Sequence, residues 1–236
     1  MAVVNLYDEG GNKMKKLRSL SFIVELFTVF FIFSLSAHAE LLNRGTDSLG
    51  NRLIYDTDFN ITWYDYTKGY DRLQNQMSWA SALTVNLGDN IYDDWRLPST
   101  VDGPYIFGYD GSTTVGYNIS TSEMGHLFYT ELGNKGFCST SGSCPQAGWG
   151  LNEKGPFTNL QPDVYWSGTE YASNPSETWF FAFGYGYQDK CCTGGYGYAL
   201  AVRPGDVAVV PEPISSILFV TGGALLAGRR YFKRKA

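Results

Sequence analysis

Leu53-Ile54-Tyr55-Asp56 and Ile61-Thr62-Trp63-Tyr64 are the two stretches that decide how the body of this 236-residue chain folds. Both are rich in β-branched and aromatic residues, which is typical of β-strands. The turn formers Asp58 and Asn60 lie between them. Two strand-like runs joined by such a short polar segment predict an antiparallel hairpin.

Asp56, Asp58 and Asn60 in this turn are spaced like the first ligands of a calcium-binding loop. Such a loop also requires a glycine and a closing glutamate, at positions where this chain has Ile61 and Thr67. We therefore expect an ordinary turn, and no metal ion or other cofactor is predicted.

Residues 77–87 carry the pattern of an amphipathic helix. Trp79, Leu83 and Leu87 recur every four positions and form an apolar stripe. Gly88 follows directly, and glycine commonly ends a helix. The stripe predicts a helix from Met77 to Leu87 that packs on the core.

A second helix is predicted after the capping box Ser120-Thr121-Ser122-Glu123, whose hydroxyl and carboxylate satisfy the first free N–H groups of a helix. Gly133 ends this helix. His126 lies outside its apolar face and is, apart from His38, the only histidine of the chain. This scarcity excludes histidine-rich metal sites and catalytic triads. The buried face is formed by Met124, Leu127, Phe128 and Leu132.

Further strands are predicted where aromatic and β-branched residues lie between turn signals. Arg96, in the first of them, is expected to be part-buried and paired with a carboxylate. Residues 102–119 and 134–162 lack a period and are predicted to be long loops, which often carry function. The predicted strands are residues 93–98, 164–170, 178–183 and 196–203.

Gly-Tyr-Gly-Tyr patterns at residues 184–187 and 195–198 flank Cys191-Cys192. The sequence predicts a turn at the two cysteines and therefore a tyrosine-rich hairpin around it. If the flat tyrosine faces remain exposed, they are suited to packing on sugar rings. Candidate ligand-binding residues are Tyr185, Tyr187, Tyr196 and Tyr198.

Residues 1–39 are predicted to be a start extension followed by a secretory signal peptide. A basic cluster precedes an apolar run, and Ala37 and Ala39 supply the small-x-small pattern before a cut ahead of Glu40. Residues 1–13 form the extension, because Met14 followed by two lysines is a more natural start. The chain is thus expected to pass through the secretion translocon.

Residues 209–236 form a tail in which Pro211, Glu212 and Pro213 precede a short apolar run and a basic end. The apolar run, residues 214–228, is shorter than the roughly 20 residues of a permanent span. This order of parts resembles the PEP-CTERM sorting signal of Gram-negative bacteria that make exopolysaccharide. The resemblance implies transient anchoring in the inner membrane, recognition by an exosortase-type processing enzyme, and transfer to the cell surface or extracellular matrix. An ordinary C-terminal anchor is the alternative.

The part of the chain between these ends is strongly acidic. Residues 40–210 hold nine Lys and Arg against nineteen Asp and Glu, a formal net charge of −10, whereas the whole chain carries −5. An acidic surface repels phosphate and sulfate backbones and lacks the basic footprint of a nucleic-acid binder. No nucleic-acid partner is therefore expected.

All four cysteines of the chain lie in the exported body, where an oxidising compartment favours disulfides. Cys138 and Cys144 bracket a small, flexible segment, which is compatible with a loop-closing bridge. Cys191 and Cys192 either form a vicinal bridge or each pair elsewhere. Four cysteines allow three pairings, and the sequence does not choose among them.

A set of short motifs in a fixed order resembles the Lcl C-terminal domain family of exported bacterial domains, which takes its name from a collagen-like adhesin. The resemblance covers about residues 44–206, within a domain that we place at residues 40–208. It implies an α+β fold of the C-type lectin-like kind, with two helices, a small antiparallel sheet and long loops. The motifs are residues 53–56 with 61–63, the helix around Trp79, and residues 94–98, 165–170 and 201–204.

The resemblance also implies adhesion or carbohydrate binding. We expect an exported surface or biofilm-matrix protein that binds extracellular polysaccharide or a cell-surface partner. The sulfated glycans linked with such adhesins do not suit a body of charge −10. One alternative is a structural matrix protein without a small ligand. The other is a cysteine-dependent oxidoreductase related to sulfatase-modifying factors, which is disfavoured because no neighbour activates a thiol, so no enzymatic activity is expected.

Overall fold

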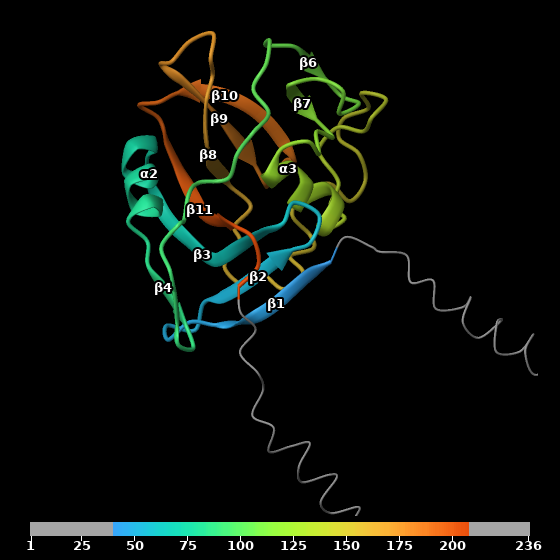
Figure 1. The fold of residues 1–236 in the computed structure, drawn as a ribbon. Coiled ribbons are helices and arrows are strands. Elements are labelled where there is room, and N and C mark those ends of the chain that lie inside the picture. Colours follow the sequence, from blue (N-terminus) through green and yellow to red (C-terminus); the bar gives the residue numbers. More distant parts are fainter. Residues whose placement is uncertain (1–39, 208–236) are drawn as a thin grey trace, which may run out of the picture. The chain divides into compact units, whose positions relative to one another are not determined.

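The computed structural model describes residues 40–207, and within this range the chain folds mainly into β structure (Figure 1). Nine strands form one mixed sheet, and two more form a small second sheet. In the described range, helix is confined to one segment of nine residues and a second of four residues that continues into a five-residue π-helix. The fold is β-sandwich-like, so the expected α+β, C-type lectin-like fold is wrong.

The elements follow one another along the chain with these bounds. The first half contains β1 (Leu41–Thr46), β2 (Arg52–Asp56), β3 (Ile61–Arg72), α2 (Leu73–Ser81), β4 (Val85–Leu87), β5 (Asn90–Tyr92), β6 (Phe107–Gly108) and β7 (Val115–Tyr117). The second half contains α3 (Glu123–His126), the π-helix η1 (Leu127–Glu131), β8 (Val164–Glu170), β9 (Glu177–Ala182), β10 (Tyr187–Cys192) and β11 (Tyr196–Pro204).

The predicted hairpin of β2 and β3 is confirmed, with Leu53 opposite Tyr64 and Ile54 opposite Trp63. The large sheet has the order β1-β2-β3-β11-β8-β9-β10-β7-β6. It is mixed because β11 pairs with β8, and β6 with β7, in parallel, whereas its other pairs are antiparallel. In Figure 1, β1 and β2 lie at one end of the molecule and β6 and β7 at the other.

The predicted tyrosine-rich hairpin around Cys191-Cys192 is wrong. Residues 187–192 form β10, which pairs with β9, whereas β11 pairs with β3 and β8. In the sheet β8 and β9 therefore separate β10 from β11. The local sequence shows two strands beside a turn but not which neighbours they choose, because strand pairing is set by the rest of the sheet.

The first helix also differs from the prediction. It begins at Leu73 and ends at Ser81, and Val85 and Leu87 lie instead on β4 of the small sheet. Both of these side chains are buried while Asn86 between them is exposed, which is the alternation of a strand. Leucines four positions apart fit a helical stripe as well as a strand, so the period was misassigned.

The second helix was predicted with the wrong cap. The helix begins at Glu123, and its cap is Ser122, whose hydroxyl oxygen accepts the N–H of Gly125. The Glu123 carboxylate makes no capping box, because both its oxygens accept hydrogen bonds from the Arg96 guanidinium at 2.7 and 2.8 Å. This pair confirms the prediction that Arg96 is part-buried and bound to a carboxylate.

The two predicted loops fare differently. Residues 102–119 contain the short strands β6 and β7, which were not predicted. Residues 134–162 form no helix or strand beyond the isolated bridges of Lys135 with Trp149 and Gly150. The buried carboxylate of Asp65 on β3 fixes the end of this loop, because it accepts the N–H groups of Thr158 and Asn159.

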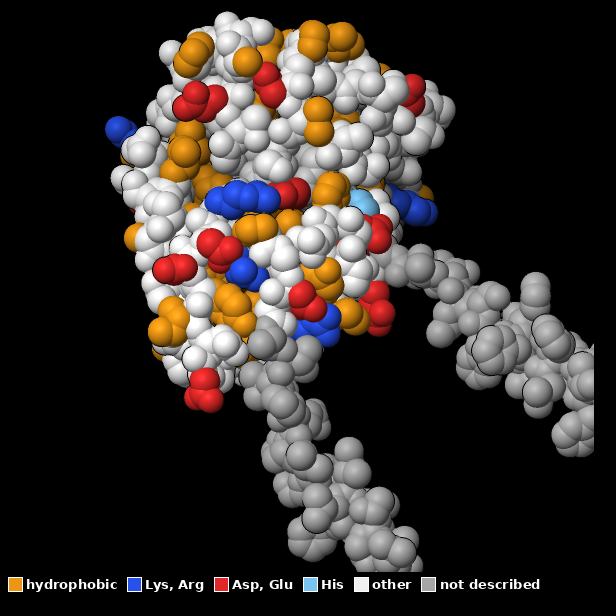
Figure 2. All heavy atoms as spheres, viewed as in Figure 1, with side chains coloured by type: hydrophobic (Ala, Val, Ile, Leu, Met, Phe, Trp, Pro, Cys, Tyr) orange, Lys and Arg blue, Asp and Glu red, His pale blue; other side chains and the backbone are white. Residues whose placement is uncertain are grey.

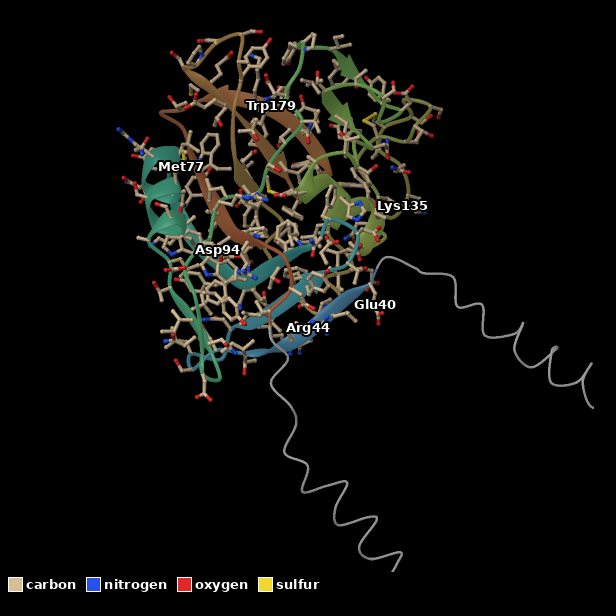
Figure 3. The ribbon with its side chains drawn as sticks, in the orientation of Figure 1. Glu40, Arg44, Met77, Asp94, Lys135 and Trp179 are labelled. Carbon is tan, nitrogen blue, oxygen red and sulfur yellow. A yellow bond between two sulfur atoms is a disulfide. The ribbon has the colours of Figure 1, made fainter. Side chains whose placement is uncertain are left out.

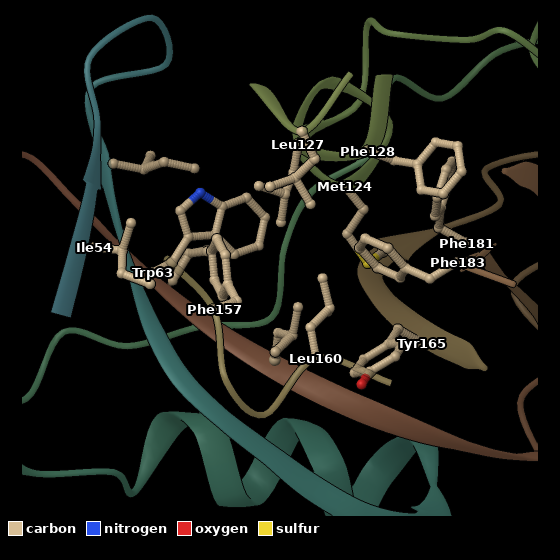
Figure 4. Packing of buried hydrophobic residues seen from close by; sticks show 14 residues of the cluster. Ile54, Trp63, Met124, Leu127, Phe128, Phe157, Leu160, Tyr165, Phe181 and Phe183 are labelled. Atoms are coloured by element: carbon tan, nitrogen blue, oxygen red, sulfur yellow. The ribbon is translucent and has the colours of Figure 1, made fainter. Parts of the chain in front are cut away.

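The main core lies where β2 and β3, the α3–η1 helix and strands β8 and β9 meet (Figure 4). Trp63, Phe128 and Phe183 are fully buried there. Figure 4 shows the Trp63 ring between Ile54 and Leu127 of the helical segment. The core holds the long loops at fixed positions around the sheet.

Candidate functional site: an exposed aromatic surface

The four candidate tyrosines do not form one face. Tyr187 begins β10 and Tyr185 lies in the turn just before it, whereas Tyr196 and Tyr198 lie on β11, on the other side of β8 and β9. No ring contact joins the two pairs among the aromatic contacts of residues 40–207. Each pair belongs to a different aromatic cluster.

The cluster of Tyr185 and Tyr187 includes seven linked rings on one side of the sheet edge, which we call the aromatic surface. Neighbouring rings have centroids 4.9 to 6.5 Å apart, the range of favourable aromatic pairs. Four of its members are more than a third exposed. The members are Phe107, Tyr109, Tyr117, Phe137, Trp149, Tyr185 and Tyr187.

Strands β7 and β10 position the buried side of the aromatic surface. Tyr117 lies directly opposite Tyr187 in the antiparallel register, and their ring centroids are 5.0 Å apart. The ring of Tyr109 stacks parallel to Tyr117 at 6.2 Å with an interplanar angle of 2°. The edge of the sheet thus holds the rings in order.

The exposed side of the aromatic surface is a stacked pair. The rings of Trp149 and Tyr185 are 5.4 Å apart with an interplanar angle of 18°, and they are 37% and 51% exposed. Phe137 packs edge-on against both rings, and its N–H donates to the Tyr185 carbonyl at 2.7 Å. The pair therefore presents flat faces held by a third, less exposed ring.

The loop closed by Cys138 and Cys144 supports this surface. These cysteines form the local disulfide that was one of the pairings left open by the sequence. The Asn118 side chain donates to the Tyr109 and Cys138 carbonyls, so it ties the loop to the aromatic surface. Lys135, near the start of this loop, lies at the right of Figure 3 below the loops of β6 and β7.

The rings of the aromatic surface are neutral, and the carboxylate of Asp189 accepts the Tyr187 hydroxyl at its inner side. Burial, followed by the nearby phenols of Tyr109 and Tyr185, raises the pKa of Tyr117. Burial and the hydrogen bond to Asp189 raise the pKa of Tyr187. Both phenols therefore stay neutral at physiological pH, and few charged side chains lie over β6 and β7 on the face shown in Figure 2.

The second pair of candidate tyrosines lies in a separate cluster. Tyr196 stacks on Tyr70 at 6.2 Å with an interplanar angle of 16°, and both are about half exposed. The Arg72 guanidinium lies 5.6 Å from the Tyr196 ring centre. Tyr198 packs inward between Tyr70 and the buried Tyr165.

Cys191 and Cys192 lie at the end of β10 as exposed free thiols with their sulfur atoms 3.4 Å apart. They form neither of the bridges that the sequence left open. Burial, followed by the hydrogen bond with Cys192, raises the pKa of the Cys191 thiol. A thiol with a raised pKa is a poor nucleophile at neutral pH, because only the thiolate attacks.

Two other features have the form of sites. A cavity of about 230 Å³ lies between α2, residues 95–99 and β8, next to Met77, which Figure 3 labels on α2. Separately, carboxylates of Asp56 and Glu131 lie close to His126 and could hold a metal ion. In the turn after β2, Asp56 Oδ1 accepts the N–H groups of Asp58 and Phe59.

The remaining predicted residues fall beyond the described range. They are the signal-cleavage residues Ala37 and Ala39 and the sorting residues Pro211, Glu212 and Pro213. Within residues 40–207, no helix has the length and apolar character needed to cross a bilayer.

Comparison with known proteins adds no relative. No family model matches this chain, and neither do any curated protein or any solved structure.

Sequence reasoning found Tyr185 and Tyr187 but missed the other five members of the aromatic surface. Phe107, Tyr109 and Tyr117 lie in the predicted loop 102–119, and Phe137 and Trp149 lie in the predicted loop 134–162. The sequence signal that could have identified them is the high aromatic content of these two loops, which show no helical or strand periodicity. Nothing local showed that the two loops meet beside β10.

Proposed function

We propose that the protein binds a neutral extracellular polysaccharide through its aromatic surface. The observation that carries this proposal is the stacked, exposed pair of Trp149 and Tyr185 within a network of neutral rings. Flat aromatic faces cover the apolar C–H faces of sugar rings, while the phenol and indole edges donate hydrogen bonds. A shallow exposed platform suits a chain ligand that runs across it.

Charge favours a neutral glycan over a sulfated one. Residues 40–210 carry nine Lys and Arg against nineteen Asp and Glu, a net charge of −10. A polyanion would be repelled by this field, whereas a neutral sugar is not affected by it. The binding is therefore expected to depend little on salt.

The proposal includes export to the cell surface or extracellular matrix, with tail processing by an exosortase-type enzyme. The signal and sorting residues that suggest this route lie outside the described residues. The Cys138–Cys144 disulfide supports it, because disulfides persist in oxidising compartments outside the cytoplasm.

Affinity electrophoresis of the purified chain in gels that contain neutral exopolysaccharide tests the proposal. The variant Trp149→Ala/Tyr185→Ala removes the stacked pair and is expected to bind about tenfold more weakly or worse, a loss of about 1.4 kcal/mol or more. The variant Tyr70→Ala/Tyr196→Ala removes the other exposed stacked pair and is the matched control.

In gels with neutral polysaccharide, the control variant should be retarded as strongly as the wild type. In gels with sulfated polysaccharide, neither the wild type nor the two variants should be retarded. Wild-type protein that runs unretarded in every neutral polysaccharide would favour the structural matrix alternative. Equal retardation of the two double variants would place binding elsewhere on the molecule.

A further inference from the structure

Three carboxylates surround the single histidine of the described chain. His126 Nε2 lies 3.2 Å from Glu131 Oε1 and 3.5 Å from Asp58 Oδ2. One oxygen of Asp56, one of Glu131 and one nitrogen of His126 all lie within 4.8 Å of one another. Four potential ligands thus converge from segments that are 70 residues apart.

The π-helix is what brings Glu131 to His126. These residues are five positions apart, and in an α-helix of 3.6 residues per turn they would point to clearly different sides. η1 follows α3 with the wider i→i+5 bonding, seen where the Leu132 N–H donates to the Leu127 carbonyl. Glu131 therefore lies over His126 and both face the Asp56 turn.

The cluster contains buried carboxylates that no Lys or Arg side chain of the described residues pairs with. Asp56 is fully buried, and the side chains of Glu131 and His126 are only 1% and 12% exposed. In residues 40–207 no Lys or Arg forms an ion pair with these carboxylates or with Asp58. A protonated imidazole offers one positive charge to the two buried carboxylates of Asp56 and Glu131, and buried charges are normally either paired or bound to metal.

We propose that Asp56, His126 and Glu131 bind one divalent transition-metal ion of the Zn²⁺ or Mn²⁺ kind. Ligand atoms on a tetrahedral zinc ion are roughly 3.4 Å apart. The ligand atoms of the cluster lie within 4.8 Å of one another, so on binding they approach by at most about 1.4 Å. An imidazole among carboxylates favours these ions over Ca²⁺ and Mg²⁺, which take oxygen ligands.

The surroundings suit an ion that enters from solvent. The Asp58 side chain is 44% exposed at the mouth of the cluster and can supply a further ligand. The Trp63 indole N–H donates to Asp56 Oδ2 at 3.4 Å and orients that carboxylate from behind. The Phe59 ring packs edge-on against His126 at 4.5 Å, so the imidazole is held in place. Such outer contacts are typical of ligating side chains.

Calorimetric titration of the metal-depleted full-length chain with ZnCl₂ and with MnCl₂ tests the site. The protein is purified without a histidine tag. We expect one equivalent to bind, and we expect CaCl₂ and MgCl₂ to bind at least about tenfold more weakly. His126→Asn should weaken the binding by about tenfold or more, because it removes the only nitrogen ligand.

His38→Asn is the matched control, since it makes the same substitution at the only other histidine and should leave binding unchanged. Asp58→Asn, at a partly exposed residue, tests the site even if His126→Asn fails to fold, and it should weaken binding measurably. Absence of stoichiometric binding, or equal affinity in the wild type and the folded His126→Asn or Asp58→Asn variant, overturns the proposal. Loss of binding in His38→Asn overturns it as well.

Discussion

Asp47 closes the turn between β1 and β2 with a single carboxylate. Its oxygens accept the N–H groups of Leu49 and Asn51 at 2.9 and 2.8 Å and the Tyr64 hydroxyl at 2.6 Å. Burial by itself would raise the pKa of Asp47, but these hydrogen bonds outweigh it and hold the pKa below its ordinary value. The charged form is therefore the one that the folded chain prefers.

Asp47→Ala is expected to lower the free energy of unfolding at pH 7 by about 2 kcal/mol, because charge-assisted hydrogen bonds are lost. The folded pKa lies below the unfolded value of about 3.9. The stabilisation is thus complete above that value and disappears as the pH falls through the folded pKa. Urea unfolding at pH 7 and at pH 2.5 should show the difference between variant and wild type shrinking in acid. An equal difference at both pH values would contradict this role.

Gly186, in the turn just before β10, is a position where no side chain fits. Its φ is +62°, and a Cβ there would lie 2.6 Å from Phe128 Cε1 and 2.9 Å from Gly136 Cα. Gly186→Ala combines overpacking with a left-handed backbone and should destabilise the fold by about 3 kcal/mol. Gly194→Ala is the control, because a Cβ there meets nothing within 4 Å. If the midpoint temperature of thermal unfolding falls equally in both variants, the contacts at Gly186 do not contribute to stability.

At the scale of elements, the Arg96–Glu123 pair joins two segments that the sheet alone does not connect. The Glu123 side chain is 8% exposed, and its Oε2 also accepts the Ser99 N–H at 2.6 Å. The backbone of Arg96 is paired with Val202 of β11. The pair therefore fixes the start of α3 against the central strands.

Glu123→Ala should destabilise the protein by about 3 kcal/mol, because it leaves the part-buried guanidinium without its carboxylate. Asp206→Ala removes the exposed partner of Arg44 and is the matched ion-pair control, with an expected loss of about 0.5 kcal/mol. Chemical denaturation of both variants measures the contrast. Similar losses would mean that burial of Glu123 adds nothing to its ion pair.

The secondary-structure elements differ in how well they could be predicted from the sequence. The hairpin of β2 and β3 and strands 164–170 and 196–203 were predictable, because aromatic and β-branched residues fill them. The two residues of β6 and the glycine-centred β7 hold no such pattern, so they are strands only because β7 pairs with β10 and β6 pairs with β7. The prediction of a helix at residues 77–87 was wrong, because leucines four positions apart fit both the repeat of a helix and the alternation of a strand.

At the scale of the whole molecule, the aromatic surface is a product of topology. Segments 107–117, 137–149 and 185–187 contribute its rings, and they meet only because β7 pairs with β10 and the disulfide loop packs beside them. Sequence reasoning joined Tyr185 and Tyr187 to Tyr196 and Tyr198 through a hairpin that does not form. The net charge of −10 could be counted in advance, whereas the neutral patch within it could not.

The most direct measurement of the central claim is titration of the protein with neutral oligosaccharide while its six indole N–H signals are followed by NMR. The six tryptophans lie at six separate places, and Trp149 belongs to the exposed stacked pair. We predict that the Trp149 signal, assigned with Trp149→Phe, shifts in proportion to saturation, while the signals of the buried Trp63 and Trp166 stay in place. A saturable shift confined to Trp95, beside the cavity, or binding without any change at Trp149, would contradict the account.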